Sequence, residues 1–311
     1  MTNHKGRKRL KSKRRKIRIF ITICTAVLFL SFTYIMDVCG VWRNIFALTK
    51  AGSIYEEGRS YPLSVTVYDA GNANCVLIRY EGYYILIDSC MHKVQNDISD
   101  KLKSAGIDRL DLVILSCPDE KYIGSMCKIA DNVWIDRFVT CECGSGETSD
   151  EYGELLKKLG EKSVPVEYVR SGDKISFGEM DLKIVAPCRQ YDSPSDNSLA
   201  VRLSFGEFAM LFMGDTSKTS QSDMLDSGEE LRCDVMLTAR QGRPNSVTDE
   251  FLRAADPRDA VISVEQTDYL PDDKVVRRIL DYGCSLYRTD YSGNIVIASD
   301  GADYSVLTQF K

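Results

Sequence analysis

Asp111-Leu-Val-Ile-Leu-Ser-Cys-Pro-Asp-Glu-Lys-Tyr-Ile-Gly-Ser-Met126 is the stretch of sequence that decides the fold. Its apolar first part predicts a buried strand, and the polar residues around Pro118 predict a turn that leads into a helix. In α/β proteins, ligands and chemistry usually lie at the carboxyl end of a strand. We therefore expect a functional site at this junction.

The surrounding segments predict two similar halves, each opening with a β-hairpin that ends in an aspartate. The first hairpin turns at Glu81-Gly82 and ends at Asp88, and the second turns at Phe205-Gly-Glu207 and ends at Asp215. Further strands are expected at Leu63–Tyr68, Leu110–Leu115, Val133–Val139, Val164–Val169, Lys174–Phe177, Asp181–Val185, Cys233–Leu237, Ala260–Val264, Ser285–Tyr287, Asn294–Ala298 and Tyr304–Thr308. Helices are expected at Val94–Ala105, Tyr122–Ala130, Ser217–Leu225, Val247–Ala254 and Asp272–Tyr282, and from Thr148 to near Gly160. Two β-rich halves with helices on their outer faces predict an α/β (α+β) protein with a four-layer αββα sandwich over residues 61–311.

The N-terminal part predicts a membrane anchor. Residues 1–18 carry ten Lys or Arg and no acidic residue, and the eighteen residues 19–36 carry no charge. Such a run is near the lower limit for a membrane-spanning helix, and the basic segment favours a cytoplasmic N-terminus. We expect residues 37–60 to be a linker and the C-terminal domain to be extracytoplasmic. A cleaved signal peptide is the alternative interpretation.

Charge and cysteine content limit the partners. Without residues 1–18, 30 basic residues face 45 acidic ones, a net charge of −15, so nucleic acid is an unfavoured partner. Of eleven cysteines, nine lie beyond Cys24 and Cys39, so an odd number leaves at least one unpaired within that part. Their disulfide state and the oligomeric state stay open. Cys141 and Cys143 are either loop thiols or a metal clip.

Eight segments in register carry a resemblance to the metallo-β-lactamase fold, in the branch attached to bacterial competence DNA-uptake channel proteins. They are Asp69-x-Gly71, Ile85-Leu-Ile-Asp88, Ile114-Leu-Ser-Cys-Pro-Asp119, Ile123-Gly124, Asp196-Asn-Ser-Leu199, Gly214-Asp215, Ile262-Ser263 and Tyr287-Arg-Thr-Asp290. The resemblance implies the αββα fold and, in active members, a two-metal hydrolase.

The metal motifs of that family are degenerate in this sequence. The pattern Thr-His-Pro-Asp-x-Asp-His-Ile-Gly-Gly is replaced by Ser116-Cys-Pro-Asp-Glu-Lys-Tyr-Ile-Gly-Ser125. Gly-His-His-Gly-Ser is replaced by Ala239-Arg-Gln-Gly-Arg243, and the late His-Pro by Leu270-Pro271. The two histidines of the chain, His4 and His92, match no ligand position. The residues expected to line the vestigial cleft are Asp69, Asp88, Cys117, Asp119, Lys121, Tyr122, Asp215, Arg240 and Gln241.

These replacements favour a non-catalytic protein without a cofactor. Cys117, Asp119 and Asp215 are the residues that would hold a metal, if one is bound. Lys121 and Arg240 are placed where they would replace the positive charge of the missing metals by ion pairs with the aspartates. Cys117 is interpreted as a buried, inert thiol rather than a nucleophile.

Two functions follow. The first is a membrane-anchored pseudo-hydrolase that binds an unknown protein or small molecule in the vestigial cleft. The alternative is a metal-dependent hydrolase, a phosphodiesterase or nuclease related to competence and DNA uptake, with atypical ligands and zinc or manganese as the cofactor.

Overall fold

The computed structural model describes residues 54–90, 98–142, 149–265, 267 and 269–310, together with Thr25 and Ser31. The chain divides into two units, Met1–Gly52 and Ser53–Lys311, and the fold described below belongs to the second. Apart from Thr25 and Ser31, the predicted anchor of residues 19–36 lies outside the described residues. Within the described part of the chain, no helix is long and apolar enough to cross a bilayer.

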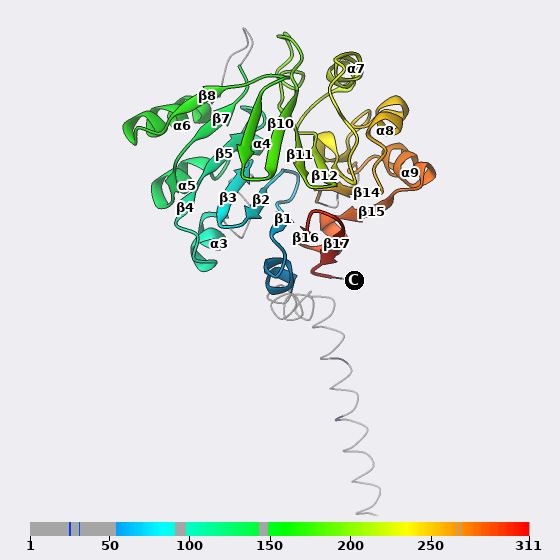
Figure 1. Cartoon of the computed structure of the whole chain (residues 1–311), viewed down its shortest axis with the longest axis horizontal. Coiled ribbons are helices and arrows are strands. Elements are labelled where there is room, and N and C mark those ends of the chain that lie inside the picture. The colour runs from blue at the N-terminus through cyan, green and yellow to red at the C-terminus, as the bar shows by residue number, and fades with distance from the viewer. Residues whose placement is uncertain are drawn as a thin grey trace, which may run out of the picture. The chain divides into compact units, whose positions relative to one another are not determined.

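Two large mixed sheets form the centre of this unit (Figure 1). The first contains, in spatial order, β17 (Tyr304–Thr308), β16 (Ile295–Ser299), β1 (Leu63–Val67), β2 (Val76–Tyr80), β3 (Tyr83–Ile87), β5 (Leu112–Leu115), β7 (Phe138–Thr140) and β8 (Val166–Tyr168). The second contains β15 (Ser285–Arg288), β14 (Asp259–Ile262), β13 (Val235–Leu237), β12 (Phe208–Phe212), β11 (Ala200–Phe205), β10 (Met180–Ala186) and β9 (Lys174–Phe177). A small parallel pair, β4 (Arg109–Leu110) and β6 (Trp134–Ile135), stands apart from both sheets.

Strand direction determines where functional side chains gather. In the first sheet, β3, β5, β7 and β8 run parallel to one another. In the second sheet, β12, β13, β14 and β15 do the same. The carboxyl ends of parallel strands share one edge of a sheet, so the loops after these strands are brought together.

Helices cover the outer face of each sheet. The labelled helices of this unit are α3 (Ile98–Ser104), α4 (Glu120–Ile123), α5 (Met126–Asn132), α6 (Asp150–Glu161), α7 (Lys218–Asp226), α8 (Asp249–Ala255), α9 (Asp273–Tyr282) and α10 (Thr289–Ser292). Figure 1 shows α3, α5 and α6 on one side of the two sheets and α7, α8 and α9 on the other. Leu155 of α6 packs in one outer cluster with Leu86 and Val113, whereas Phe251 of α8 packs in another with Leu211 and Met236. The predicted four layers are therefore present.

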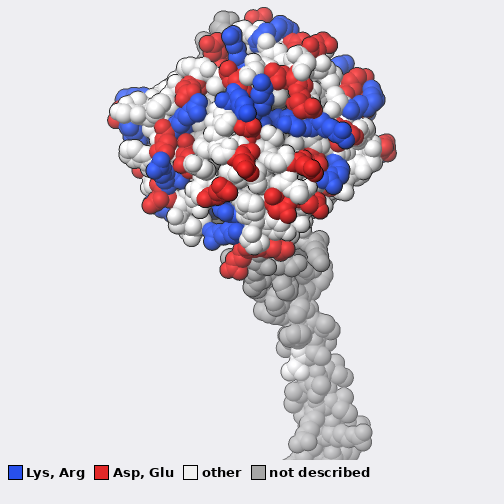
Figure 2. Space-filling model, in the orientation of Figure 1, with Lys and Arg blue, Asp and Glu red and all other residues white. Residues whose placement is uncertain are grey.

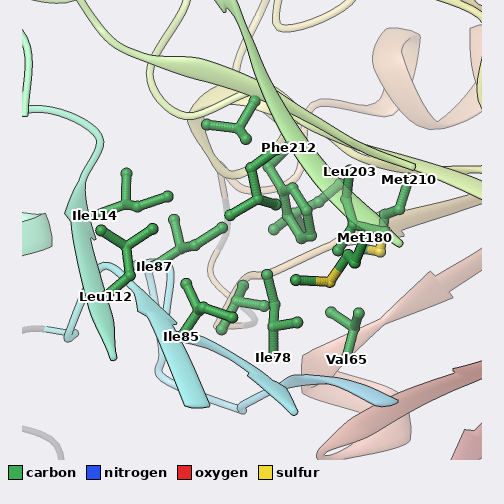
Figure 3. Close-up of a cluster of buried hydrophobic side chains, with 14 of the residues drawn as sticks. Val65, Ile78, Ile85, Ile87, Leu112, Ile114, Met180, Leu203, Met210 and Phe212 are labelled. Carbon is green, nitrogen blue, oxygen red and sulfur yellow. The ribbon is translucent and has the colours of Figure 1, made fainter. Parts of the chain in front are cut away.

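The two sheets pack on each other through apolar side chains (Figure 3). Ile85 and Ile87 of β3 enter this central cluster, while Leu86 between them faces the helices. This is the period of two expected of a strand that is buried on both faces. Leu203 and Phe212 meet them from the second sheet.

Three predicted elements are wrong in their extent. The helix predicted at Tyr122–Ala130 is two helices, α4 and α5, because the backbone leaves the helical path at Gly124 (φ −11°, ψ −66°). The strands predicted at Leu110–Leu115 and Val133–Val139 each divide into two pieces. Their first pieces pair in the separate small sheet. The break falls at Asp111, whose carboxylate accepts the backbone N–H of Tyr84 at 2.8 Å.

Two other predicted segments are partly described. Of the helix predicted at Val94–Ala105, the described part begins at Ile98, and residues 94–97 lie outside the described residues. Within the predicted linker, residues 54–59 form a helix. The guanidinium of Arg79 on β2 donates hydrogen bonds to the carbonyls of Gly58 and Tyr61, and Ile54 is buried.

Because the two sheets pack on each other through buried side chains, a cavity between them should lower the stability of the protein. Leu203→Ala, at a fully buried position of the central cluster, should lower the free energy of unfolding by about 2–5 kcal/mol. Leu280→Ala is the matched control, since Leu280 is 51% exposed, and should change it by less than about 0.5 kcal/mol. Urea denaturation measures both, and equal effects would contradict the assignment of the core.

Candidate functional site

The candidate site is built from the segments that follow β3, β5, β12 and β13, together with the loop between β10 and β11. Backbone hydrogen bonds hold these loops to one another. Ser89 N donates to Tyr122 O at 3.0 Å, Leu199 N to Ser116 O at 2.7 Å, and Arg240 N to Gly214 O at 3.0 Å. The predicted convergence of strand ends is therefore present, and it joins the two sheets.

Tyr122 is the centre of this site. Its hydroxyl donates to Asp215 Oδ1 at 2.7 Å and accepts from Gln241 Nε2 at 3.1 Å. All three residues are buried, with exposed fractions of 0%, 5% and 1%. The phenol thus links a loop of the first sheet to two loops of the second.

Asp215 has both carboxylate oxygens engaged. Oδ1 accepts from Tyr122, and Oδ2 accepts from Ser195 Oγ at 2.8 Å. Its backbone N–H donates to Ser198 Oγ, also at 2.8 Å. Burial, and then the neighbouring charge of Asp215, hold the pKa of Tyr122 well above its usual value, so the phenol stays a protonated donor at neutral pH.

Asp88 forms a second buried pair with Ser116. Asp88 Oδ1 accepts the backbone N–H of Ser116 and Oδ2 accepts its hydroxyl, each at 2.8 Å. Burial raises the pKa of Asp88 to about 7, against the lowering effect of these hydrogen bonds, and the charge of Asp215 adds to the rise. The backbone of Asp88 is left-handed (φ 58°), a conformation that Asp and Asn tolerate better than most residues.

Cys117 is a buried thiol beside these carboxylates. Its Sγ lies 3.8 Å from the carbonyl of Pro194. Burial, followed by the charge of Asp215, raises the pKa of Cys117 well above its usual value. A thiol held protonated is a poor nucleophile, which favours the interpretation of Cys117 as an inert thiol.

Asp119 and Lys121 pair locally. Their side chains form an ion pair at 3.5 Å, and Asp119 also caps α4 by accepting the backbone N–H of Lys121 at 3.0 Å. Asp119 is 44% exposed, so this is a surface contact with a small energy. Asp69 follows β1 and is half-buried, and its backbone N–H donates to Asn294 Oδ1 at 2.8 Å.

The loop after β13 has an unusual backbone. Arg240, Gln241 and Gly242 are consecutive left-handed residues, with φ values of 54°, 52° and 72°. Gly214, on the adjacent loop, is also left-handed, and a Cβ there would lie 2.5 Å from Leu199 O. Only glycine fits at position 214.

The described residues do not fit the two-metal centre of the fold. Among them, no three His, Cys, Asp or Glu side chains converge as a metal-binding group, so Cys117, Asp119 and Asp215 are not assembled as ligands. Both carboxylate oxygens of Asp215 accept hydroxyl hydrogen bonds instead. His92 and Cys143 lie outside the described residues.

Three serines of the site were missed as site residues. Ser116, Ser195 and Ser198 supply hydroxyls to Asp88, Asp215 and the Asp215 backbone. Ser116 directly follows an apolar strand, which is a signal that sequence analysis can use. Ser195 lies in an irregular loop and has no comparable signal.

Six of the described cysteines are free thiols. They are Cys75, Cys117, Cys127, Cys188, Cys233 and Cys284. Burial raises the pKa of Cys75 and Cys233 as it does that of Cys117.

Comparison with known proteins finds two related competence proteins. The chain is 24% identical over 197 residues to ComE operon protein 3 of Bacillus subtilis (strain 168), which covers 62% of this chain and 25% of that protein. It is 26% identical over 238 residues to Competence protein ComA of Neisseria gonorrhoeae, covering 74% of this chain and 31% of that protein. The chain therefore spans about a quarter to a third of the length of these relatives. No protein-family model matches the chain.

Solved structures share the fold. The metallo-β-lactamase fold protein YhfI from Bacillus subtilis superposes with a TM-score of 0.53 at 13% identity, over 76% of this chain and 98% of that one. CmlA, a diiron β-hydroxylase from Streptomyces venezuelae, superposes with a TM-score of 0.51 at 14% identity, over 80% and 54%. Likeness at such low identity concerns the fold alone.

The Tyr122 hydrogen bonds predict a stability effect. Tyr122→Phe removes the hydroxyl and leaves Asp215 Oδ1 and Gln241 Nε2 without a partner, so the free energy of unfolding should fall by about 1–3 kcal/mol. Tyr269→Phe, at a side chain 85% exposed, is the control and should have an effect below about 0.5 kcal/mol. Urea denaturation of the two variants tests this, and a neutral Tyr122→Phe would show that the bonds add no stability.

Asp88 predicts a pH dependence. An unfolded Asp has a pKa near 3.9, whereas burial holds the pKa of Asp88 near 7. Between these values the folded state keeps a proton that the unfolded state has lost, so stability falls as pH rises from about 4 to 7, by an amount on the order of 4 kcal/mol. Asp88→Asn cannot titrate and keeps an acceptor for Ser116 N–H. It should equal the wild type near pH 4 and exceed it above pH 7. Parallel pH profiles for the two proteins in urea denaturation would refute the assignment.

Proposed function

We propose that this chain, a competence-related protein of the metallo-β-lactamase fold, is a non-catalytic relative of metallo-hydrolases that binds a partner or small ligand beside Asp215. The observation that carries the proposal is the hydrogen bond from the Tyr122 hydroxyl to Asp215. In this bond a neutral phenol occupies Asp215, one of the three residues that would hold a metal if one is bound.

The chemistry of the neighbouring groups supports this proposal. Two-metal hydrolysis requires several anionic or imidazole ligands around a metal-activated water. Around Asp215 the described neighbours are instead a phenol, a primary amide and a serine hydroxyl, from Tyr122, Gln241 and Ser195. The Tyr122 hydroxyl bonds to both Asp215 and Gln241, and the Ser195 hydroxyl bonds to Asp215.

The alternative function is a metal-dependent phosphodiesterase or nuclease with atypical ligands. Its support is the relation to competence proteins and the presence of Asp119 and Asp215. Against it stands the net charge of −15 beyond residue 18, which opposes binding of a polyanionic substrate. Figure 2 shows acidic and basic side chains interspersed on the face that it draws, rather than segregated by sign.

We also propose that residues 19–36 anchor the protein in the cell membrane and that residues 61–311 are extracytoplasmic. The support is the uncharged run of eighteen residues after ten basic ones. An extracytoplasmic location permits disulfides, whereas six of the described cysteines, Cys75, Cys117, Cys127, Cys188, Cys233 and Cys284, are free. Most of these thiols are buried, and burial keeps them protonated. Oxidation proceeds through exposed thiolates, so free thiols are compatible with an extracytoplasmic location.

Metal content and turnover test the proposed function. The full chain, purified in detergent, should carry substoichiometric zinc, manganese and iron by elemental mass spectrometry. It should hydrolyse neither bis-p-nitrophenyl phosphate nor single-stranded DNA with added manganese or zinc, because Asp215 is engaged by Tyr122 and Ser195. Turnover that Asp215→Ala abolishes would establish the hydrolase instead. Asp281→Ala, at an exposed carboxylate of α9, is the control for that variant.

A further inference from the structure

Unsatisfied polar atoms concentrate in the loop after β13. Eight buried side-chain N or O atoms have no hydrogen-bond partner among the described residues, and five of them lie between Thr238 and Ser246. The five are Thr238 Oγ1, Arg240 Nε, Gln241 Oε1, Arg243 Nε and Ser246 Oγ. A buried polar atom without a hydrogen-bond partner destabilises the folded protein. A concentration of such atoms in one loop therefore indicates that a ligand binds there.

Two of these atoms belong to arginines. Arg240 and Arg243 are half-buried, and neither guanidinium forms an ion pair or a hydrogen bond with a described residue. Asp215 lies on the neighbouring loop, but its carboxylate oxygens accept from Tyr122 and Ser195 instead. The two positive charges are therefore available to a ligand.

The backbone brings the two arginines together. Arg243 N donates to Arg240 O at 3.0 Å, which closes one turn between them. The turn is anchored at both ends, because Arg240 N donates to Gly214 O at 3.0 Å and Asp272 N donates to Gly242 O at 2.9 Å. Arg240 and Gln241 adopt left-handed conformations that cost about 1 kcal/mol or more each, so the surrounding structure enforces this arrangement.

We propose that Arg240 and Arg243 bind a compact oxyanion, the phosphate or carboxylate group of a small ligand. A guanidinium presents several N–H donors in a planar fork that matches such a group, and pairs of this kind are charge-assisted. The oxyanion supplies acceptors for N–H donors of the two half-buried guanidinium groups. The proposal names the ligand class for the non-catalytic binding function and rests on that function.

Phosphate binding to the full chain in detergent tests the proposal. Isothermal titration calorimetry at neutral pH and constant ionic strength, after removal of metals on a chelating resin, should detect binding of inorganic phosphate. Arg240→Gln and Arg243→Gln should each weaken it by at least about tenfold, because each removes a charged donor. A parallel titration with acetate distinguishes the two sources, since tighter acetate binding would point to a carboxylate ligand.

Arg253→Gln is the matched control, because Arg253 on α8 is 63% exposed and pairs with Glu250. It removes the same charge and should leave phosphate affinity within about twofold. Thermal unfolding confirms that each variant is folded. A folded wild-type chain that binds neither phosphate nor acetate, or arginine variants that bind phosphate as the wild type does, would overturn the proposal.

Metal content of the same samples separates this proposal from the proposed function. If the untreated chain holds metals and turns over phosphodiesters, the non-catalytic function fails. In that case, the titrations of the metal-free chain with phosphate and acetate still decide whether the oxyanion site exists.

Discussion

The hydrogen bond between Tyr122 and Asp215 is the contact on which the arrangement of the site depends. It joins the loop after β5 in one sheet to the loop after β12 in the other, and both partners are buried. A neutral donor on a buried carboxylate is a strong contact, because the alternative is an unpaired charge away from water. Gln241 adds the loop after β13 to the same phenol. Three loops thus form one hydrogen-bonded unit, and the unit leaves the neighbouring arginines without an acidic partner.

The layers of the fold were predictable because strands that are buried on both faces have recognisable runs of apolar residues. In β3, Ile85 and Ile87 face the other sheet while Leu86 faces helices, which requires an apolar residue at every position. Element boundaries were less predictable. The apolar spacing of Tyr122–Ala130 fits one helix, whereas the chain turns at Gly124 so that Ser89 can bond to the carbonyls of Tyr122 and Ile123. The glycine is a local signal for the break, whereas the hydrogen bonds from Ser89 involve a partner distant in sequence.

Sequence predicted that Tyr122, Asp215 and Gln241 lie near one another, and it did not predict the contacts between them. The family resemblance marked Tyr122, Asp215 and Gln241, yet nothing in the sequence indicates that a phenol bridges the other two. Ion pairs replacing the metals were expected from both Lys121 and Arg240. Lys121 does pair, but with Asp119 two residues away at the surface, which is a local contact. Arg240 does not, because its left-handed backbone is tied to Gly214 and its guanidinium reaches no described carboxylate.

The phenol of Tyr122 also constrains how this sequence can change over evolutionary time. Its oxygen donates to one neighbour and accepts from another, so replacing any one of Tyr122, Asp215 and Gln241 disturbs a bond made by at least one of the other two. A single substitution at any of the three positions therefore lowers the stability of the protein. The residues that are tolerated at one position depend on the residues at the other two. The three positions should consequently covary, so that relatives carry the trio together or lack it together.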